Sequence, residues 1–226
     1  LAAKEYKTPE EIRDAVAKGI IAIPANINHT TLDPEGVGEG LRTKVNVNLG
    51  ISGDLMDEEM ELEKARIALE LGAEGIMDLS NHGKTREFRR KLLAMSSAMI
   101  GTVPMYDAIG YLEKPLIGIT AQDFLDVVRA HAEDGVDFVT VHAGMNRRVI
   151  ESFKETGRLM NIVSRGGSLI FAWMEATGNE NPFYEHYDEV LEILHEYDVT
   201  ISIGDAMRPG CTYDASDAGQ IAELIE

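Results

Sequence analysis

A short β-branched run, a polar loop and an amphipathic helical stretch follow one another repeatedly along this chain. Strands are predicted at residues 44–49, 74–79, 99–103, 137–141, 161–163 and 199–203. Helices are predicted at residues 57–71, 121–134 and 187–197, because apolar side chains recur there at helical spacing. Strands that alternate with helices are typical of right-handed βαβ units and a parallel sheet. The chain is therefore predicted to be an α/β protein.

The first 20 residues are predicted to form a helical lead-in to this repeat. Thr8, Pro9 and Glu11 stand where an N-cap, a first helical residue and a capping-box carboxylate are expected, and Gly19 suits the helix end. No linker follows, so residues 1–226 are predicted to form a single domain. The start at Leu1, without an initiator Met, suggests that this end is trimmed.

Polar or charged side chains that could bind a ligand or transfer a proton follow nearly every predicted strand. This pattern favours a (β/α)8 TIM-type barrel over an open doubly wound sheet. A barrel builds its active site at the carboxyl ends of its strands. A dinucleotide fold carries a glycine fingerprint after its first strand, and none is present here. About six of the eight βα units are visible in the sequence. The domain is therefore expected to be incomplete at its C-terminal end.

Composition excludes several classes of protein. The chain has 21 basic and 39 acidic residues, and a net charge of −18 disfavours binding to nucleic acid or an anionic membrane. It has neither an apolar run of membrane-spanning length nor a signal-peptide core. The single cysteine, Cys211, excludes an internal disulfide and is predicted to be a small buried apolar residue. A reducing cytoplasm is the expected location.

Three polar residues near strand ends have both a structural and a functional interpretation. Asn46 and Asn48 alternate with apolar residues, so both amides face one way, and we favour ligand binding over a polar layer inside the barrel. His142 directly follows a predicted strand. It is either a satisfied core histidine or a group for acid–base or substrate contact, and the residues leave both open.

Two loops are suited to binding a charged or polar ligand. Residues 164–168 read Ser-Arg-Gly-Gly-Ser, in which glycines admit an anion while Ser164 and Arg165 supply a hydroxyl and a guanidinium. A plain glycine turn is the alternative. Asp205 and Arg208 follow the last predicted strand, and they either pair with each other or hold a ring amine or ribose hydroxyl. In so acidic a chain, the first loop is a candidate clamp for phosphate or carboxylate.

Together these segments resemble the thiamin pyrimidine synthase family, an atypical radical-SAM group with a pyrimidine-forming and a benzimidazole-forming branch. The resemblance begins near residue 20 and lies in residues 23–29, 38–46, 77–80, 100–104, 162–168 and 205–210. It implies a (β/α)8 barrel that rearranges 5-aminoimidazole ribonucleotide, with a 4Fe-4S cluster that cleaves S-adenosylmethionine. The implied substrate-binding residues are Asn48, Met77, Tyr106, His142, Ser164, Arg165, Gly166, Asp205, Ala206, Met207 and Arg208.

The resemblance also implies groups that this chain lacks. The family's two metal histidines and its three-cysteine cluster motif have no match up to Glu226. We therefore expect the cluster, and zinc or another divalent metal, only in a longer protein of which this chain is an N-terminal portion. The expected partner is the ribonucleotide, without nucleic acid or membrane, and a homodimer is left open.

Three departures from the pyrimidine-forming branch bear on the product. Val47 stands where that branch has alanine, Asn81 and His82 replace a threonine and a glycine, and Ala206 replaces a glycine. Because all lie in or beside strand-end loops, they favour a carbon–carbon lyase that makes 5-hydroxybenzimidazole for the lower ligand of cobamides. The alternatives are a phosphomethylpyrimidine synthase for thiamin and a non-catalytic nucleotide-binding fragment.

Overall fold

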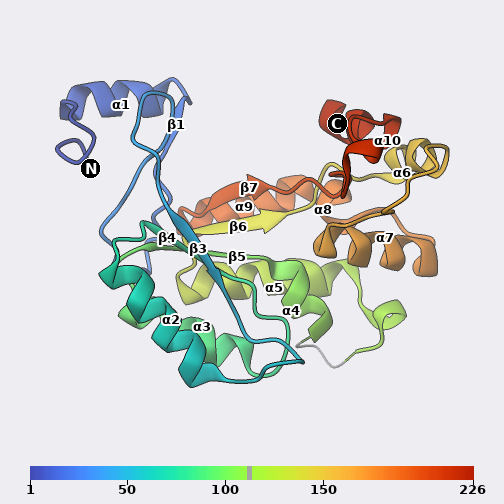
Figure 1. Ribbon diagram of the computed structural model, residues 1–226, viewed down its shortest axis with the longest axis horizontal. Coiled ribbons are helices and arrows are strands. Elements are labelled where there is room, and N and C mark those ends of the chain that lie inside the picture. The colour runs from blue at the N-terminus through green and yellow to red at the C-terminus, as the bar shows by residue number, and fades with distance from the viewer. Residues whose placement is uncertain (111–113) are drawn as a thin grey trace.

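The computed structural model describes residues 1–110 and 114–226 and shows an α/β fold around one parallel sheet (Figure 1). Five strands pair in the order β3, β4, β5, β6, β7, all parallel. They span β3 Asn46–Leu49, β4 Gly75–Asp78, β5 Met99–Thr102, β6 Phe138–Val141 and β7 Thr200–Ile203. A separate antiparallel pair consists of β1 Ile21–Ala22 and β2 Val37–Gly38. The predicted fold class is confirmed.

Helices connect these strands. The longer ones are α1 Pro9–Ala17, α2 Glu58–Glu70, α3 Thr85–Met95, α5 Ala121–Asp134, α6 Arg147–Lys154, α7 Arg165–Thr177, α9 Tyr187–Tyr197 and α10 Ala218–Ile225. The shorter ones are α4 Pro104–Gly110, α8 Pro182–Glu185 and the 3-10 turns η1 Leu116–Gly118 and η2 Thr212–Asp214. The helices predicted at 121–134 and 187–197 are confirmed residue for residue.

Helix ends follow the local sequence. At α1, the Thr8 side chain accepts a hydrogen bond from the Glu11 backbone N–H while the Glu11 carboxylate accepts one from the Thr8 N–H. Gly19, with φ of 72°, follows the C-cap residue Lys18. At α5, Thr120 makes the corresponding box and Gly135 ends the helix in the left-handed region, with φ of 105°. The predicted capping box of the lead-in helix is confirmed.

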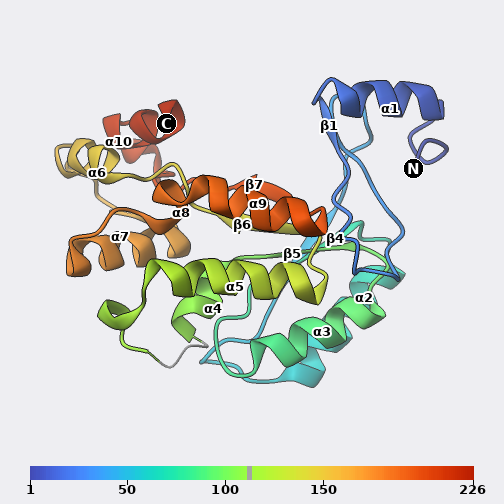
Figure 2. The same cartoon turned by 180° about the vertical axis from the view of Figure 1, so that it is seen from behind.

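The two faces of the sheet differ in what covers them. Ile76, Ile100 and Val139 project from one face and are fully buried. Figure 2 shows α3, α5 and α9 lying across that face. Side chains alternate along a strand, so Asn48 and Met77, which are partners in the register, project from the opposite face. That face is the more open one, because Asn48 is exposed and Met77 is half-buried.

Aromatic rings from three helices form the centre of the core. The ring of Phe124 on α5 packs edge-on against Trp173 of α7 and Phe183 of α8, with centroids 5.5 and 5.6 Å apart. The Trp173 indole N–H donates to the Ile119 carbonyl at 2.9 Å. Satisfying the one polar atom of a buried indole fixes the ring, so α7 is anchored to the sheet's helical layer.

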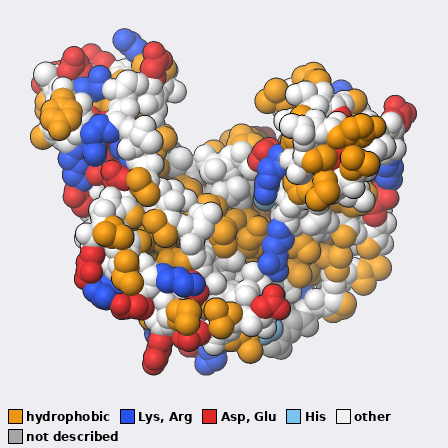
Figure 3. All heavy atoms as spheres, in the orientation of Figure 1, with side chains coloured by type: hydrophobic (Ala, Val, Ile, Leu, Met, Phe, Trp, Pro, Cys, Tyr) orange, Lys and Arg blue, Asp and Glu red, His pale blue; other side chains and the backbone are white. Residues whose placement is uncertain are grey.

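Two raised parts stand at opposite ends of the sheet. The pair β1–β2 and helix α1 lie at the amino end of the strands, and α6, α7 and α10 lie at the carboxyl end (Figure 1). Figure 3 shows the surface hollowed between them, with basic side chains on the wall formed by the C-terminal helices. No helix in the described part of the chain is both long enough and apolar enough to cross a membrane.

One predicted strand is wrong. Residues 161–163 lie in the loop between α6 and α7, and β7 pairs directly with β6 instead. Asn161 has φ of 56°, a left-handed backbone that a strand cannot accommodate. The five-stranded sheet is compatible with part of a (β/α) barrel, and it does not close within the described residues.

Candidate active site

His142 is the most deeply buried of the predicted site residues that titrate. It directly follows β6 and is 4% exposed. Its Nε2 lies 3.1 Å from the Ser164 hydroxyl, while its buried Nδ1 has no hydrogen-bond partner among the described residues. Leaving a buried polar atom without a partner destabilises the fold by about 1–3 kcal/mol. Such an atom calls for an explanation, and contact with a ligand is the one that the proposed function below develops.

Burial lowers the pKa of His142 to about 4, and the charge of Arg208 acts in the same direction. The imidazole is therefore neutral at pH 7 and offers one N–H donor and one acceptor nitrogen. A neutral ring suits contact with a polar heterocycle or a hydroxyl better than direct pairing with a phosphate.

Ser164 begins helix α7 and brings its first turn against His142. The Ser164 hydroxyl accepts the Gly167 N–H at 3.1 Å, which makes it the N-cap. A Cβ on Gly166 would lie 2.2 Å from the His142 ring, and one on Gly167 would lie 2.8 Å from Ala206. Residues 164–168 are thus a helix start rather than a plain turn. A helix N-terminus favours anions through its free N–H groups and its dipole.

Two arginines converge on Tyr106, which lies on α4. The Arg165 guanidinium stands 5.2 Å from the centre of the Tyr106 ring. Burial raises the pKa of the Tyr106 hydroxyl, and the charges of Arg165 and Arg208 oppose that rise. Arg208 also donates to the Asp205 carbonyl at 3.1 Å and lies 3.4 Å from its carboxylate. The Asp205–Arg208 pair anticipated from the sequence forms, yet both side chains stay exposed.

At the opposite edge of the sheet, the amide pair of β3 lies as predicted. Asn46 Nδ2 donates to Asn48 Oδ1 at 3.0 Å, so both amides face one way. Met77 lies next to Asn48 in the register and is half-buried, not the core residue its type alone would predict. Their roles toward a ligand stay predictions.

The structure brings most of the predicted site together at the carboxyl end of the sheet. The group around His142 comprises Tyr106, Ser164, Arg165, Gly166, Asp205 and Arg208. Ala206 and Met207 differ, because both residues are fully buried. Their N–H groups bind Glu223, and the Met207 carbonyl accepts from Arg158. These two residues therefore shape the loop from within.

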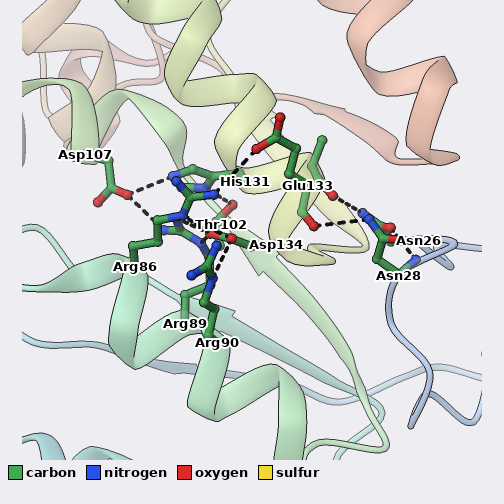
Figure 4. A network of polar contacts seen from close by, with 11 residues as sticks. Asn26, Asn28, Arg86, Arg89, Arg90, Thr102, Asp107, His131, Glu133 and Asp134 are labelled. Carbon is green, nitrogen blue, oxygen red and sulfur yellow. Dashed lines mark hydrogen bonds and ion pairs between the residues drawn. The ribbon is translucent and has the colours of Figure 1, made fainter.

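A buried ionic network around Asp107 has no signal in the sequence (Figure 4). The Asp107 carboxylate accepts from Arg89 Nη1 and lies within reach of His131 Nε2, each at 2.8 Å, and His131 Nδ1 lies 2.8 Å from the Thr102 hydroxyl. Burial alone raises the pKa of Asp107, but the contacts with His131 and Arg89 outweigh it and hold that pKa well below its usual range. The partners come from α3, α5 and β5, so no local motif indicates them.

The donor set of this chain does not fit an iron–sulfur cluster. Cys211 is the only cysteine and is half-buried rather than buried. One thiol cannot supply the several thiolates that hold a cluster. Within residues 1–110 and 114–226, no three His, Cys, Asp or Glu side chains gather as a metal site.

Relatives of known name share most of this sequence. A phosphomethylpyrimidine synthase of Alkaliphilus oremlandii (strain OhILAs) is 62% identical over 222 residues, covering 98% of this chain and 51% of that protein. One of Pelotomaculum thermopropionicum is 60% identical over 225 residues, covering 100% and 52%. One of Clostridioides difficile (strain 630) is 60% identical over 222 residues, covering 98% and 51%. The chain spans about half the length of the curated relatives it matches.

These relatives overturn the expectation of a benzimidazole-forming enzyme. At 57–62% identity they carry the name of the pyrimidine-forming branch. The structure gives a physical reason why two of the departures misled. Val47 projects toward the helical layer, in register with Ile76, and Ala206 is buried against Gly167. The Val47 side chain therefore points away from the open face of the sheet, and Ala206 has no exposed surface.

The family itself was predicted correctly. The Radical SAM ThiC family model matches residues 1–226, the entire chain. Together with the relatives above, this match shows that the chain belongs to the radical SAM ThiC family.

Proposed function

We propose that this chain is the ribonucleotide-binding part of a phosphomethylpyrimidine synthase, a cytoplasmic radical-SAM lyase acting on 5-aminoimidazole ribonucleotide. The observation that carries the proposal is the convergence of Arg165, Arg208 and the start of α7 beside His142. The buried Nδ1 of His142 has no hydrogen-bond partner within residues 1–110 and 114–226. A cationic cluster next to a neutral imidazole suits a ligand with a phosphate at one end and a heterocycle at the other.

Each group has a task that follows from its chemistry. The first turn of α7 and Arg165 bind the phosphate, because free N–H groups and a guanidinium fork both donate to anionic oxygens. Asp205 accepts from a ribose hydroxyl or the ring amine. His142 orients the imidazole, and Asn48 and Met77 hold its outer edge. Their combined effect is to fix the nucleotide before any bond is broken.

S-adenosylmethionine and a 4Fe-4S cluster would supply the radical chemistry that the family name implies. Because the single thiol of this chain does not fit a cluster, we derive no reaction step through it. We assign to this chain the binding and orientation of the ribonucleotide alone.

The test is titration of the whole gene product with 5-aminoimidazole ribonucleotide, followed by anaerobic turnover with S-adenosylmethionine and a reductant. We expect saturable binding that the ribonucleoside without phosphate does not match, and hydroxymethylpyrimidine phosphate as the product by mass. Binding without any product would favour a non-catalytic nucleotide-binding protein. Absence of ribonucleotide binding would remove the proposal altogether.

A further inference from the structure

Glu223, on α10, binds the loop that follows β7 with both oxygens of its carboxylate. Its Oε1 accepts the Ala206 N–H at 2.8 Å and its Oε2 accepts the Met207 N–H at 2.6 Å. The residue is 8% exposed. Hydrogen bonds to an ionised acceptor are roughly twice as strong as neutral ones, and two parallel bonds fix direction as well as distance. A carboxylate thus clamps two successive peptide groups.

The same loop is held from one further side. Arg158 Nη2 donates to the Met207 carbonyl at 2.5 Å, and its guanidinium pairs with Asp217 at 2.6 Å. Gly144 leaves room for the Glu223 side chain, because a Cβ there would lie 3.0 Å from Glu223 Cγ. Several hydrogen bonds therefore fix the backbone of the loop. Its flanking side chains, Asp205 and Arg208, are nevertheless exposed.

We propose that Glu223 is a positioning residue that fixes this loop so that Asp205 and Arg208 are aimed at the ribonucleotide. The inference rests on the proposed function, because it assigns the loop to that ligand. Asp205 and Arg208 immediately flank the two peptide groups that Glu223 binds. Fixing the backbone beforehand lowers the ordering cost when the ligand arrives. A merely structural role would instead attach α10 to the sheet and leave affinity unaffected.

The experiment compares Glu223→Gln and Glu223→Asp in the whole gene product. The glutamine keeps the shape but opposes an NH₂ donor to one of the two N–H groups, and the aspartate keeps the charge but is one methylene shorter. The control is Glu151→Gln, which removes the same charge from an exposed position on α6, the helix that packs against α10. Calorimetry gives the dissociation constant for 5-aminoimidazole ribonucleotide, and hydrogen exchange reports the Ala206 and Met207 amides.

We expect Glu223→Gln to raise the dissociation constant roughly tenfold, as the loss of one charge-assisted bond implies. Amide exchange should rise at 206 and 207 and stay unchanged in α7. Glu223→Asp should show a smaller change in the same direction, and it keeps the test open if the glutamine variant does not fold. Wild-type affinity in both folded variants overturns the inference. Failure of the unmodified protein to bind the ribonucleotide overturns the proposed function instead, and unchanged exchange at 206 and 207 still refutes the clamp.

Discussion

The two ends of the sheet each bury a histidine, and the two histidines differ in how completely they are bonded. At the amino end, His29 Nδ1 lies 2.7 Å from the Asp137 carboxylate and Nε2 lies 3.1 Å from the Ser96 carbonyl. At the carboxyl end, His142 contacts Ser164 through one nitrogen and leaves the other unpartnered among the described residues. A closed network indicates a structural role, whereas an open one indicates a place reserved for a ligand.

Asp137 completes the closed network. Besides His29, its carboxylate accepts the N–H groups of Asn26 at 3.0 Å and Ile100 at 2.7 Å, and the residue is fully buried. These bonds tie the N-terminal segment to β5 and to the start of β6. In the part of the chain that the structure describes, no acidic side chain forms a hydrogen bond with His142.

The largest expected effect comes from opening the closed network. Asp137→Ala leaves two buried N–H groups and an imidazole without their acceptor, so we expect a loss of about 3–5 kcal/mol in the free energy of unfolding. Asp205→Ala, at the exposed position on the other end, should change it by less than about 0.5 kcal/mol. Urea unfolding measures both. Equal losses of unfolding free energy in the two variants would show that the two ends of the sheet do not differ in this way.

The next effect concerns affinity rather than stability. Arg165→Ala should weaken ribonucleotide binding by about 1.5–3 kcal/mol, roughly 10- to 150-fold, because it removes a charge-assisted contact with phosphate. Its melting temperature should stay close to that of the wild type. The matched control is Arg13→Ala on α1, an equally charged and exposed residue at the other end of the molecule. Unchanged affinity in a folded Arg165→Ala protein would show that Arg165 does not bind the phosphate.

The stabilisation contributed by the two histidines depends on pH in opposite directions. Burial lowers the pKa of His29, but the hydrogen bond and charge of Asp137 outweigh it and raise that pKa above 6.5. The stabilisation from His29 is therefore complete below pH 6.5 and is lost as the pH rises through the raised value. His142 has a pKa of about 4, so its contribution to the stability of the fold is complete above pH 6.5. That contribution is lost as the pH falls toward 4.

These signs are tested with His29→Ala and His142→Ala in urea titrations across pH 4.5–8.5. His29→Ala should be most destabilising at the acid end. His142→Ala should cost about 1–2 kcal/mol at pH 7 and less at pH 4.5, while it reduces turnover at every pH. Parallel pH profiles for the two variants would show that the histidines play the same role.

The smallest expected effect is the loss of the contact between Arg165 and the Tyr106 ring. Tyr106→Leu should weaken ribonucleotide binding by about 0.5–1 kcal/mol, the usual size of an exposed cation–π contact. Tyr106→Phe keeps the ring and should bind almost as the wild type does. A larger loss of affinity in the phenylalanine variant would show that the hydroxyl, and not the ring, makes the contribution.

Features with a local cause could be predicted from the sequence. Thr120 and Gly135 bound α5 by capping, and the apolar spacing between them determines its face, so its range was predicted correctly. The strand ends at Asn48 and His142 followed from hydrophobic runs. The amide pair faces one way because side chains alternate along any strand.

Features with a non-local cause could not. Asn161 adopts a left-handed backbone that its β-branched successors do not indicate, and this invalidated one strand. The contact between Asp107 and His131 spans 24 residues and joins two helices, and nothing local indicates it. Ala206 packs against Gly167 at the start of α7, a contact between distant segments, so the sequence alone could not indicate that Ala206 is fully buried.

Helix α7 provides a way to observe the candidate anion-binding loop, residues 164–168, directly. Trp173 is the only tryptophan of the chain, and it lies on the same helix whose first turn holds Arg165. Its indole is buried and held by the Ile119 carbonyl. Indole emission moves to longer wavelength when water reaches the ring. The fluorescence of this chain therefore reports, without any attached dye, whether the helix that begins with Arg165 is still packed in the core.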